Sequence, residues 1–229
     1  MKTVCIRQPG YLPYIGFFKK IQSCDIFVYF DDAQYAIRAW DNRNQIRNKD
    51  EKMWITVPVI KPYKLKLNEV LIIQNNWQQK HLMTIKTNYE NSPYFDDYWK
   101  KLSSIYNKNW EKLIDLNIEL IKFFMQELDI STQTIKSSDL DADGSSSEKL
   151  LNICKKLNAT TYLSGEMGLQ YMDEKIFKEN NVQIIFEHFI HPVYNQNSNS
   201  FIPNLSILDL LFNEGNNAQN ILQQSKNIS

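Results

Sequence analysis

The fold class follows from residues 3–32, TVCIRQPGYLPYIGFFKKIQSCDIFVYFDD. A short apolar run at Thr3–Ile6 predicts a strand, and apolar residues at helical spacing predict a helix over Tyr14–Ser23. The continuous apolar run Ile26–Phe30 is typical of a strand that is buried on both faces. A strand, a helix and a second buried strand in this order predict an α/β fold, with a Rossmann-like, mainly parallel sheet and flanking helices.

The middle of the chain has a different character. Ala39–Asn48 is rich in Asn and Arg and predicts a polar loop. The apolar patterns that follow predict strands at Trp54–Val59 and Val70–Ile73 and helices at Gln78–Tyr89, Tyr94–Tyr106 and Trp110–Leu128. We therefore expect a single α/β domain over residues 1–229 with a helical middle insertion, and a helical subdomain at about residues 78–130.

The last third of the chain returns to alternating helices and strands. Ser145 and Glu148 have the spacing of a capping box, which predicts a helix that runs to about Leu157. We expect Gly215 to end the last helix, and the Asn- and Gln-rich tail after residue 215 to fray. The elements expected in between are a strand at Thr161–Leu163, a loop at Ser164–Gly168, a helix at Lys175–Glu179, a strand at Val182–Phe186 and a helix at Leu205–Phe212.

Charge and cysteine content exclude several classes of protein. The 26 Lys and Arg residues balance 26 Asp and Glu residues, which argues against a dedicated nucleic-acid binder with a basic excess. Cys5, Cys24 and Cys154 are widely spaced, which favours buried free thiols in a reducing compartment. No apolar run approaches the roughly 20 residues of a membrane-spanning helix, so we expect a cytoplasmic protein.

The first candidate binding site combines the loop Arg7–Gly16 with Asp31 and Asp32. Both features are expected beyond the carboxyl ends of strands, where open α/β sheets bind ligands. Backbone N–H groups at the start of the predicted helix and the charge of Arg7 would suit an anion. The alternative is a structural turn in which aromatic rings pack and Arg7 pairs with a carboxylate. The binding residues predicted in this region are Arg7, Gln8, Tyr11, Tyr14, Gly16, Asp31 and Gln34.

The second candidate site is the polar segment Arg38–Arg47. Its guanidinium groups suit phosphate, and Trp40 could stack on a base or a sugar ring. The alternative is a solvated polar loop. The binding residues predicted here are Arg38, Trp40, Asn42, Arg43 and Asn44.

Two of the three histidines, His81 and His191, are candidates for acid–base chemistry because imidazole titrates near neutral pH. His81 lies on a predicted helix, and His188 and His191 lie near the end of the last predicted strand. His188 and His191 lack a third ligand at a suitable spacing, so we predict no metal site. A structural role is the alternative for each histidine. Ser164 and Gly165 form a further candidate binding loop, and the chain has no Walker A, G-x-G-x-x-G or H-E-x-x-H motif.

Taken in order, these motifs resemble the WbqC-like protein family. The resemblance covers almost the whole chain, and it implies a role in O-antigen or capsule biosynthesis, in which an amino sugar receives a glycyl or another acyl group. His81 and His191 match the family pattern, whereas Arg7 stands where the family often has His. The matching segments are QPGYLPYIGFFKKI from Gln8, Asp31–Tyr35, Asn42–Asn44, Trp54–Val59, Trp77 with Lys80 and His81, Tyr162–Gly165, His191–Tyr194 and Leu205–Asn213.

Three hypotheses follow from these residues and the resemblance. The first is an N-acyltransferase that acts on a dTDP- or UDP-linked amino sugar with a coenzyme A or acyl-carrier thioester as donor, and with His81, His191 or Asp32 as base. Arg7, Arg38 or Arg43 would hold the diphosphate, Lys80, Ser164, Gly165 and Tyr194 would complete the site, and Lys61, Lys64 and Lys66 would recognise the donor. The second is an ATP- and Mg²⁺-dependent carboxylate–amine ligase or a nucleotidyltransferase-like enzyme. The third is a glycan- or partner-binding protein without catalytic activity. An acyl carrier protein and a second copy of the chain are the candidate protein partners.

Overall fold

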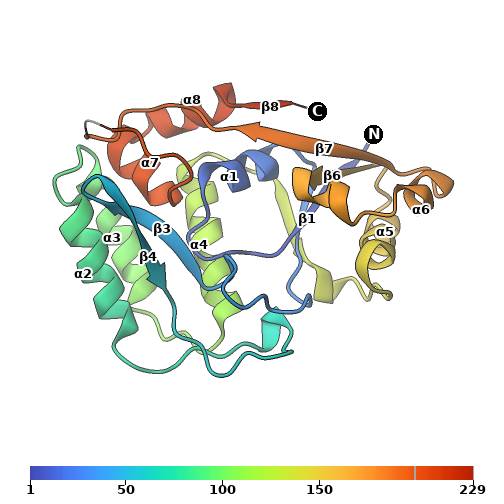
Figure 1. The fold of residues 1–229 in the computed structure, drawn as a ribbon, viewed down its shortest axis with the longest axis horizontal. Coiled ribbons are helices and arrows are strands. Elements are labelled where there is room, and N and C mark those ends of the chain that lie inside the picture. Colours follow the sequence, from blue (N-terminus) through green and yellow to red (C-terminus); the bar gives the residue numbers. More distant parts are fainter. Residues whose placement is uncertain (199, 229) are drawn as a thin grey trace.

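The computed structural model describes residues 1–198 and 200–228, with side chains up to residue 225. The main sheet has the strand order β5-β2-β1-β6-β7-β8, in which the first five strands are parallel and β8 runs antiparallel to β7 (Figure 1). This arrangement confirms the predicted α/β fold with a Rossmann-like, mainly parallel sheet. The strands are β1 (Thr3–Arg7), β2 (Ile26–Tyr29), β5 (Gln133–Lys136), β6 (Thr161–Gly165), β7 (Gln183–Ile190) and β8 (Lys226–Ile228).

The order of the parallel strands reverses between β1 and β6. From β1 the chain continues outward through β2 to β5, and then returns to pair β6 with the other side of β1, with Cys5 opposite Leu163. Connections that leave in opposite directions create a crevice at the carboxyl ends of the two strands. Arg7 ends β1 and Gly165 ends β6, so both lie at this crevice.

Alternating side chains of β1 explain the layers on either side of the sheet. Val4 and Ile6 pack into a hydrophobic cluster with α5 (Ser146–Lys156) and α6 (Glu174–Glu179). Cys5 points to the other face, where the larger core includes α1 (Ile15–Gln22). Both faces of the sheet are therefore covered by helices, as the continuous apolar runs require.

The predicted helical insertion is confirmed between β4 and β5. It consists of α2 (Trp77–Tyr89), α3 (Phe95–Tyr106) and α4 (Leu113–Glu127). Helix α4 is buried on several sides because apolar residues occupy most of its positions. The division of the chain into a domain and a subdomain stays a prediction.

Two expectations in the middle of the chain are wrong. The expected loop Ala39–Asn48 ends in strand β3 (Arg43–Asn48), which pairs with β4 (Glu51–Thr56) as a hairpin. The expected strand Val70–Ile73 makes only isolated bridges, because Ile72 bonds to the backbone of Glu111 and faces Val59. A short 3₁₀ helix, Leu67–Glu69, precedes this segment. Strand β5 was not expected, because its mixed sequence QTIK has no strand-like hydrophobic pattern.

Two expectations in the last third are also wrong. Ser145 precedes α5 without a side-chain capping bond, so the capping box does not form. Ser164 and Gly165 belong to β6, and the 3₁₀ helix Glu166–Gln170 replaces the rest of the expected loop.

The C-terminal region is more ordered than the sequence suggested. Helix α7 (Ile207–Glu214) ends at Gly215, whose φ of 54° confirms the predicted stop. The tail does not fray at once, because α8 (Asn217–Gln224) buries Ala218 and Leu222, and β8 then joins the sheet.

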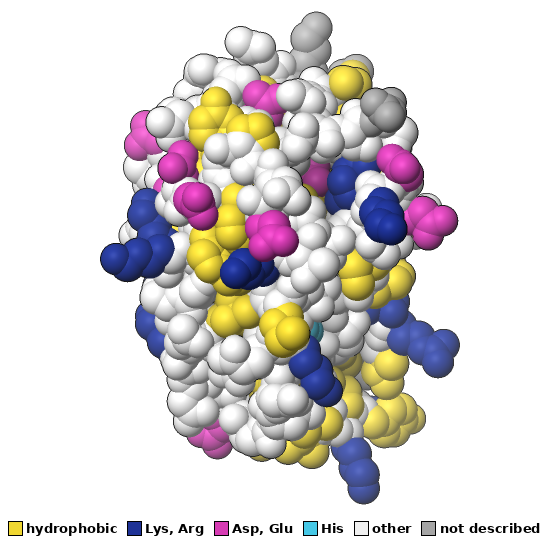
Figure 2. All heavy atoms as spheres, turned by 90° about the vertical axis from the view of Figure 1, so that its left-hand side faces the viewer, with side chains coloured by type: hydrophobic (Ala, Val, Ile, Leu, Met, Phe, Trp, Pro, Cys, Tyr) yellow, Lys and Arg dark blue, Asp and Glu magenta, His cyan; other side chains and the backbone are white. Residues whose placement is uncertain are grey.

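The three cysteines are free and buried, as predicted. Among the described residues, no helix combines the length and the apolar character that crossing a membrane requires. Figure 2 shows the face at the left of Figure 1. Most acidic side chains of this face lie in the upper half, whereas Lys and Arg side chains lie in both halves, in the lower half beside hydrophobic side chains.

Candidate active site

Two cavities meet at the carboxyl end of β1, and Arg7 and Tyr14 line both of them. Cavity 1 has a volume of about 430 Å³ and lies between the loop after β1 and the segment before β3. Cavity 2 has a volume of about 390 Å³ and lies over the ends of β1, β6 and β7. Cavity 1 is lined by Arg7, Gln8, Gly10, Pro13, Tyr14, Phe17, Ala39, Trp40, Asp41, Asn44 and Asn204. Cavity 2 is lined by Cys5, Ile6, Arg7, Tyr14, Gly16, Lys20, Leu163, Gly165, Glu166, Met167, Gly168, Tyr171, Glu187, His188 and Phe189.

Amide side chains hold the loop between β1 and α1 in place. Leu12 is fully buried with a φ of 45°, a conformation that is strained for a bulky residue. Asn44 stabilises it by donating from Nδ2 to the carbonyl oxygens of Tyr11 (3.2 Å) and Leu12 (2.7 Å). Asn117 donates to the carbonyl oxygens of Pro9 (2.8 Å) and Asp41 (2.7 Å), which ties the loop to the opposite wall of cavity 1.

Asp41 is the buried carboxylate of cavity 1. Asp41 is only 4% exposed, and its carboxylate accepts a hydrogen bond from the backbone N–H of Ala36 at 3.0 Å. Burial raises the pKa of Asp41 to about 6, and the bond from Ala36 offsets only part of this effect. A carboxylate with this pKa can accept a proton near neutral pH, as a general base must.

The remaining wall of cavity 1 is largely aromatic. Pro13, Tyr14, Phe17 and Trp40 supply apolar surface. Trp40 is half exposed and packs on Trp54 with ring centroids 5.2 Å apart. Apolar walls with a few converging polar groups are typical of small-molecule sites.

Cavity 2 carries more charge than cavity 1. Lys20 and Glu187 form a buried ion pair with 3.9 Å between Nζ and Oε2. At the rim, Oε2 of Glu166 lies 2.9 Å from Nδ1 of His188, and both side chains are exposed. Within residues 1–198 and 200–228, no three His, Cys, Asp or Glu side chains are grouped to hold a metal ion.

The predicted catalytic role of His81 does not fit its position in the core. Tyr11 Oη lies 2.8 Å from His81 Nδ1, and the Thr56 carbonyl oxygen lies 3.1 Å from Nε2. Burial lowers the pKa of His81 to about 4, so the ring is neutral at pH 7. Trp77 and Tyr106 enclose the ring, and His81 lines neither cavity.

His191 and Asp32 also lie outside the two cavities as the described residues form them. Nδ1 of His191 lies 2.8 Å from the carbonyl oxygen of Pro192, and burial lowers the pKa of this imidazole. Burial alone would raise the pKa of Asp32, but hydrogen bonds and ion pairing with Lys149 and Ser137 lower it instead. Asp32 therefore connects β2 to neighbouring elements.

Asp31 has a similar structural role. Its carboxylate accepts hydrogen bonds from Ser137 Oγ at 3.0 Å, from the Ser138 N–H at 3.0 Å and from Ser138 Oγ at 2.7 Å. These bonds join the end of β2 to the end of β5, away from both cavities.

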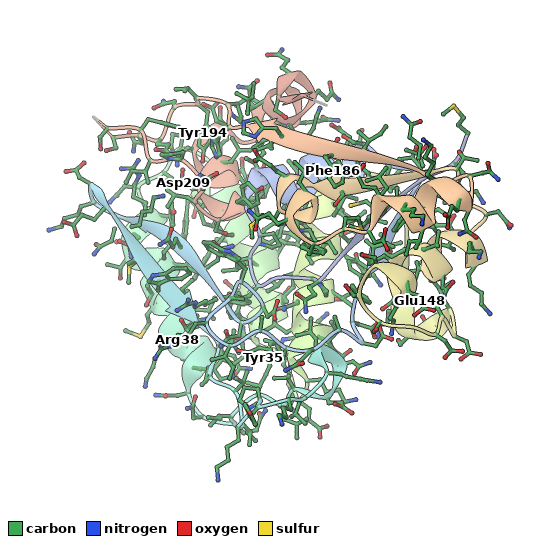
Figure 3. The ribbon with its side chains drawn as sticks, turned by 45° about the vertical axis from the view of Figure 1, so that its right-hand side comes forward. Tyr35, Arg38, Glu148, Phe186, Tyr194 and Asp209 are labelled. Atoms are coloured by element: carbon green, nitrogen blue, oxygen red, sulfur yellow. The ribbon has the colours of Figure 1, made fainter. Side chains whose placement is uncertain are left out.

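The predicted binding residues divide into two groups. Seven of them line the cavities. Arg7 and Tyr14 line both cavities, Gln8, Trp40 and Asn44 line cavity 1, and Gly16 and Gly165 line cavity 2. The others do not line either cavity: Tyr11, Asp31, Gln34, Arg38, Asn42, Arg43, Lys80, Ser164 and Tyr194. Figure 3 shows Arg38 in the lower left part of the molecule and Tyr194 in the upper left part beside Asp209.

Most members of the second group have structural partners. Tyr194 donates to buried Asp209 at 2.9 Å, and Asn42 donates to the carbonyl oxygen of Val57 at 2.8 Å. Arg43 bonds to the backbone carbonyl of Arg38 and stacks on Trp54 at 4.2 Å. Lys80 and Gln34 are exposed, and Ser164 is buried beside Gly168.

Sequence reasoning missed the charged residues Asp41, Lys20, Glu187, Glu166 and His188 as parts of the site. Asp41 stood inside the second candidate segment and could have been selected as its only carboxylate. Lys20 looked like an ordinary helix lysine, and Glu187 is more than 160 residues from it in the chain. Only the pairing of β1 with β6 and of β6 with β7 brings them together.

The fold and the two cavities place the chain among the α/β proteins that have a crevice at the switch point of a parallel sheet. The chain belongs to the WbqC-like protein family, whose model matches residues 8–221, and this confirms the resemblance read from the motifs. It is also similar to the uncharacterized protein Rv1507c of Mycobacterium tuberculosis. The two are 36% identical over 227 residues, which cover 97% of this chain and 98% of that protein.

Proposed function

We propose that the chain is an N-acyltransferase that transfers an acyl group, such as an aminoacyl group, to the amine of a nucleotide-linked amino sugar. One observation carries the proposal. Asp41, a buried carboxylate whose pKa is raised to about 6, lines the same cavity as the fixed cation of Arg7. A base that works near neutral pH beside a phosphate-binding charge is what an amine on a sugar diphosphate needs.

The acceptor would span the two cavities at Arg7. The guanidinium would bind the diphosphate, because its planar fork matches phosphate oxygens. The sugar would enter cavity 1, where the half-exposed ring of Trp40 offers a stacking surface and Gln8 and Asn44 offer polar groups. The sugar amine would then lie within reach of Asp41.

The chemical step needs one proton acceptor. An ammonium group has no free electron pair, so the sugar amine must lose a proton before it attacks the carbonyl carbon of a thioester. A C–N bond forms, the C–S bond breaks, and the sulfur leaves as a thiol after taking the second proton that the amine nitrogen loses as the amide forms. The carboxylate of Asp41 accepts the proton from the amine, and at a pKa of about 6 it returns this proton to water at neutral pH.

The donor would be coenzyme A or an acyl carrier protein, and it would approach over the basic segment 61–66. Lys61, Lys64 and Lys66 are exposed, and so are Ile60 and Tyr63 between and beside them. Cations beside apolar side chains suit an acidic carrier or a phosphorylated cofactor. Both donors and nucleotide sugars are cytoplasmic metabolites, so we place the reaction in the cytoplasm.

The test incubates the full chain with UDP- and dTDP-linked amino sugars and acyl thioesters, and follows the product by mass spectrometry. We expect a mass gain of one acyl group in the sugar nucleotide, lost in Asp41→Asn and retained in the exposed control Asp143→Asn. Transfer from a free acid that requires ATP would overturn the proposal in favour of a ligase. Equal activity of Asp41→Asn and the unchanged protein would exclude Asp41 as the base.

A further inference from the structure

Cavity 2 contains the buried Lys20, whose ammonium group has no carboxylate within hydrogen-bond distance among the described residues. The side chain of Lys20 is 8% exposed, and its Nζ lies 3.9 Å from Oε2 of Glu187. Charge-assisted hydrogen bonds between such groups are about 2.7–2.9 Å long. The ion pair therefore leaves the ammonium protons directed at neighbouring atoms or at the cavity that Lys20 lines.

The preceding residue, Lys19, is a lysine of the same helix that has a structural role. Lys19 donates from Nζ to the carbonyl oxygens of Leu222 and Gln223, each at 3.1 Å, at the end of α8. Lys19 and Lys20 thus point to different surroundings, although they are neighbours in α1. Of these two lysines, only Lys20 lines cavity 2.

Two cations meet in the inner part of cavity 2. Burial lowers the pKa of Lys20, and Arg7 lowers it further, whereas Glu187 opposes this effect. Arg7 and Lys20 line the same cavity, so their like charges repel each other, and the buried carboxylate of Glu187 lines it too. Among the described lining residues, Glu166 and His188 are further titratable side chains at the rim, and they form their own exposed pair. An anion bound between the two cations would relieve their repulsion.

Glycines keep space open along the same wall. A Cβ at Gly165 would lie 3.1 Å from Lys20 Nζ, tighter than ordinary contact. A Cβ at Gly168 would lie 2.2 Å from Ser164 Oγ, and one at Gly16 would lie 2.5 Å from the ring of Tyr14. Side chains at these positions would crowd the wall or narrow the space beside Lys20.

We propose that cavity 2 is a phosphate subsite in which Lys20 and Arg7 bind the anion together, with Gly165 providing the room that the ammonium group needs. A doubly charged phosphate group matches two cations better than a carboxylate does. The inference rests on the proposed function for the source of the phosphate, which would be the diphosphate of the nucleotide sugar. Inorganic pyrophosphate has the same chemistry and serves as a second probe.

The experiment measures binding of UDP, pyrophosphate and uridine to the full chain by calorimetry. We compare the unchanged protein with Lys20→Met, which removes the charge, and with Lys19→Met as the matched control. We expect Lys20→Met to weaken UDP binding by at least about tenfold, the size expected for a hydrogen bond to a charged group. Lys19→Met should stay within about twofold, and uridine binding should be the same in all three proteins.

Gly165→Ala provides a second variant that keeps both charges. Its added Cβ would crowd Lys20, so we expect weaker UDP binding without a change in uridine binding. UDP binding that is unchanged in Lys20→Met and in Gly165→Ala would overturn the subsite, as would absence of UDP and pyrophosphate binding to the unchanged protein. Pyrophosphate binding that depends on Lys20 without UDP binding would support the subsite and assign it to free phosphate compounds.

The two proposals can fail separately. Lys20-dependent UDP binding in a protein without acyl transfer would support the subsite and refute the transferase. Acyl transfer whose KM for the nucleotide sugar is the same in Lys20→Met as in the unchanged protein would support the transferase and refute the subsite.

Discussion

Replacing Asp41 by Asn should make the protein more stable at neutral pH while removing its activity. The ionised carboxylate is buried, and burial raises its pKa from 3.8 to about 6. At about 1.36 kcal/mol for each pH unit, this difference of about 2 units means that ionised Asp41 destabilises the folded state by about 3 kcal/mol. Asn keeps an oxygen that can accept the bond from Ala36 and carries no charge.

The pH dependence has a definite sign. Between pH 3.8 and about 6 the folded state holds a proton on Asp41 that the unfolded state has lost. The contribution of protonated Asp41 is therefore fully present below pH 3.8 and is lost as the pH rises through about 6. Asp41→Asn should equal the unchanged protein near pH 4 and exceed it by up to about 3 kcal/mol at pH 7.5.

Urea unfolding followed by circular dichroism at several pH values between 4 and 8 measures this difference directly. Asp209, whose pKa burial also raises to about 6, titrates in both proteins and cancels in the comparison. The exposed substitution Asp143→Asn is the control for the removal of a surface carboxylate. A difference between Asp41→Asn and the unchanged protein that stays constant over this range would refute a raised pKa for Asp41.

Three further substitutions separate structural from binding roles. Gly16→Ala should lower the free energy of unfolding by about 1–3 kcal/mol in urea titrations, because its Cβ would lie 2.5 Å from the ring of Tyr14, and an unchanged stability would contradict that packing. Tyr194→Phe should cost about 1–3 kcal/mol because buried Asp209 loses a donor, with UDP affinity unchanged in calorimetry. If Tyr194→Phe lost UDP affinity but kept its full stability, Tyr194 would be a binding residue. Trp40→Ala should raise the KM for the amino sugar roughly two- to tenfold with little change in Tm, as expected for loss of one stacking contact.

The sheet could be predicted where its strands are buried on both faces. Ile26–Tyr29 is a continuous apolar run because helices cover both sides of it, and the same holds for β1. Strand β3 gave no such signal. Its buried positions include Asn44, whose amide is occupied with the loop before α1 rather than with a hydrophobic core.

The candidate site could be predicted by location better than by residue. The loop after β1 lies at the switch point, as the order of strand, loop and helix suggested. The catalytic candidates were chosen for their side-chain chemistry. The structure places His81, His191 and Asp32 outside both cavities, and their catalytic role stays a prediction. His81 is a core residue with both ring nitrogens engaged, whereas Asp41 gains its raised pKa from an environment that no local pattern encodes.

The central claim is that one cleft binds the nucleotide sugar and brings its amine to Asp41. A crystal structure of the protein with a UDP-linked amino sugar tests it most directly. We predict density for the diphosphate in contact with Arg7 and Lys20, and the sugar amine within hydrogen-bond distance of the Asp41 carboxylate. A bound nucleotide sugar whose diphosphate lies away from Arg7, or whose amine points out of cavity 1, would contradict the claim.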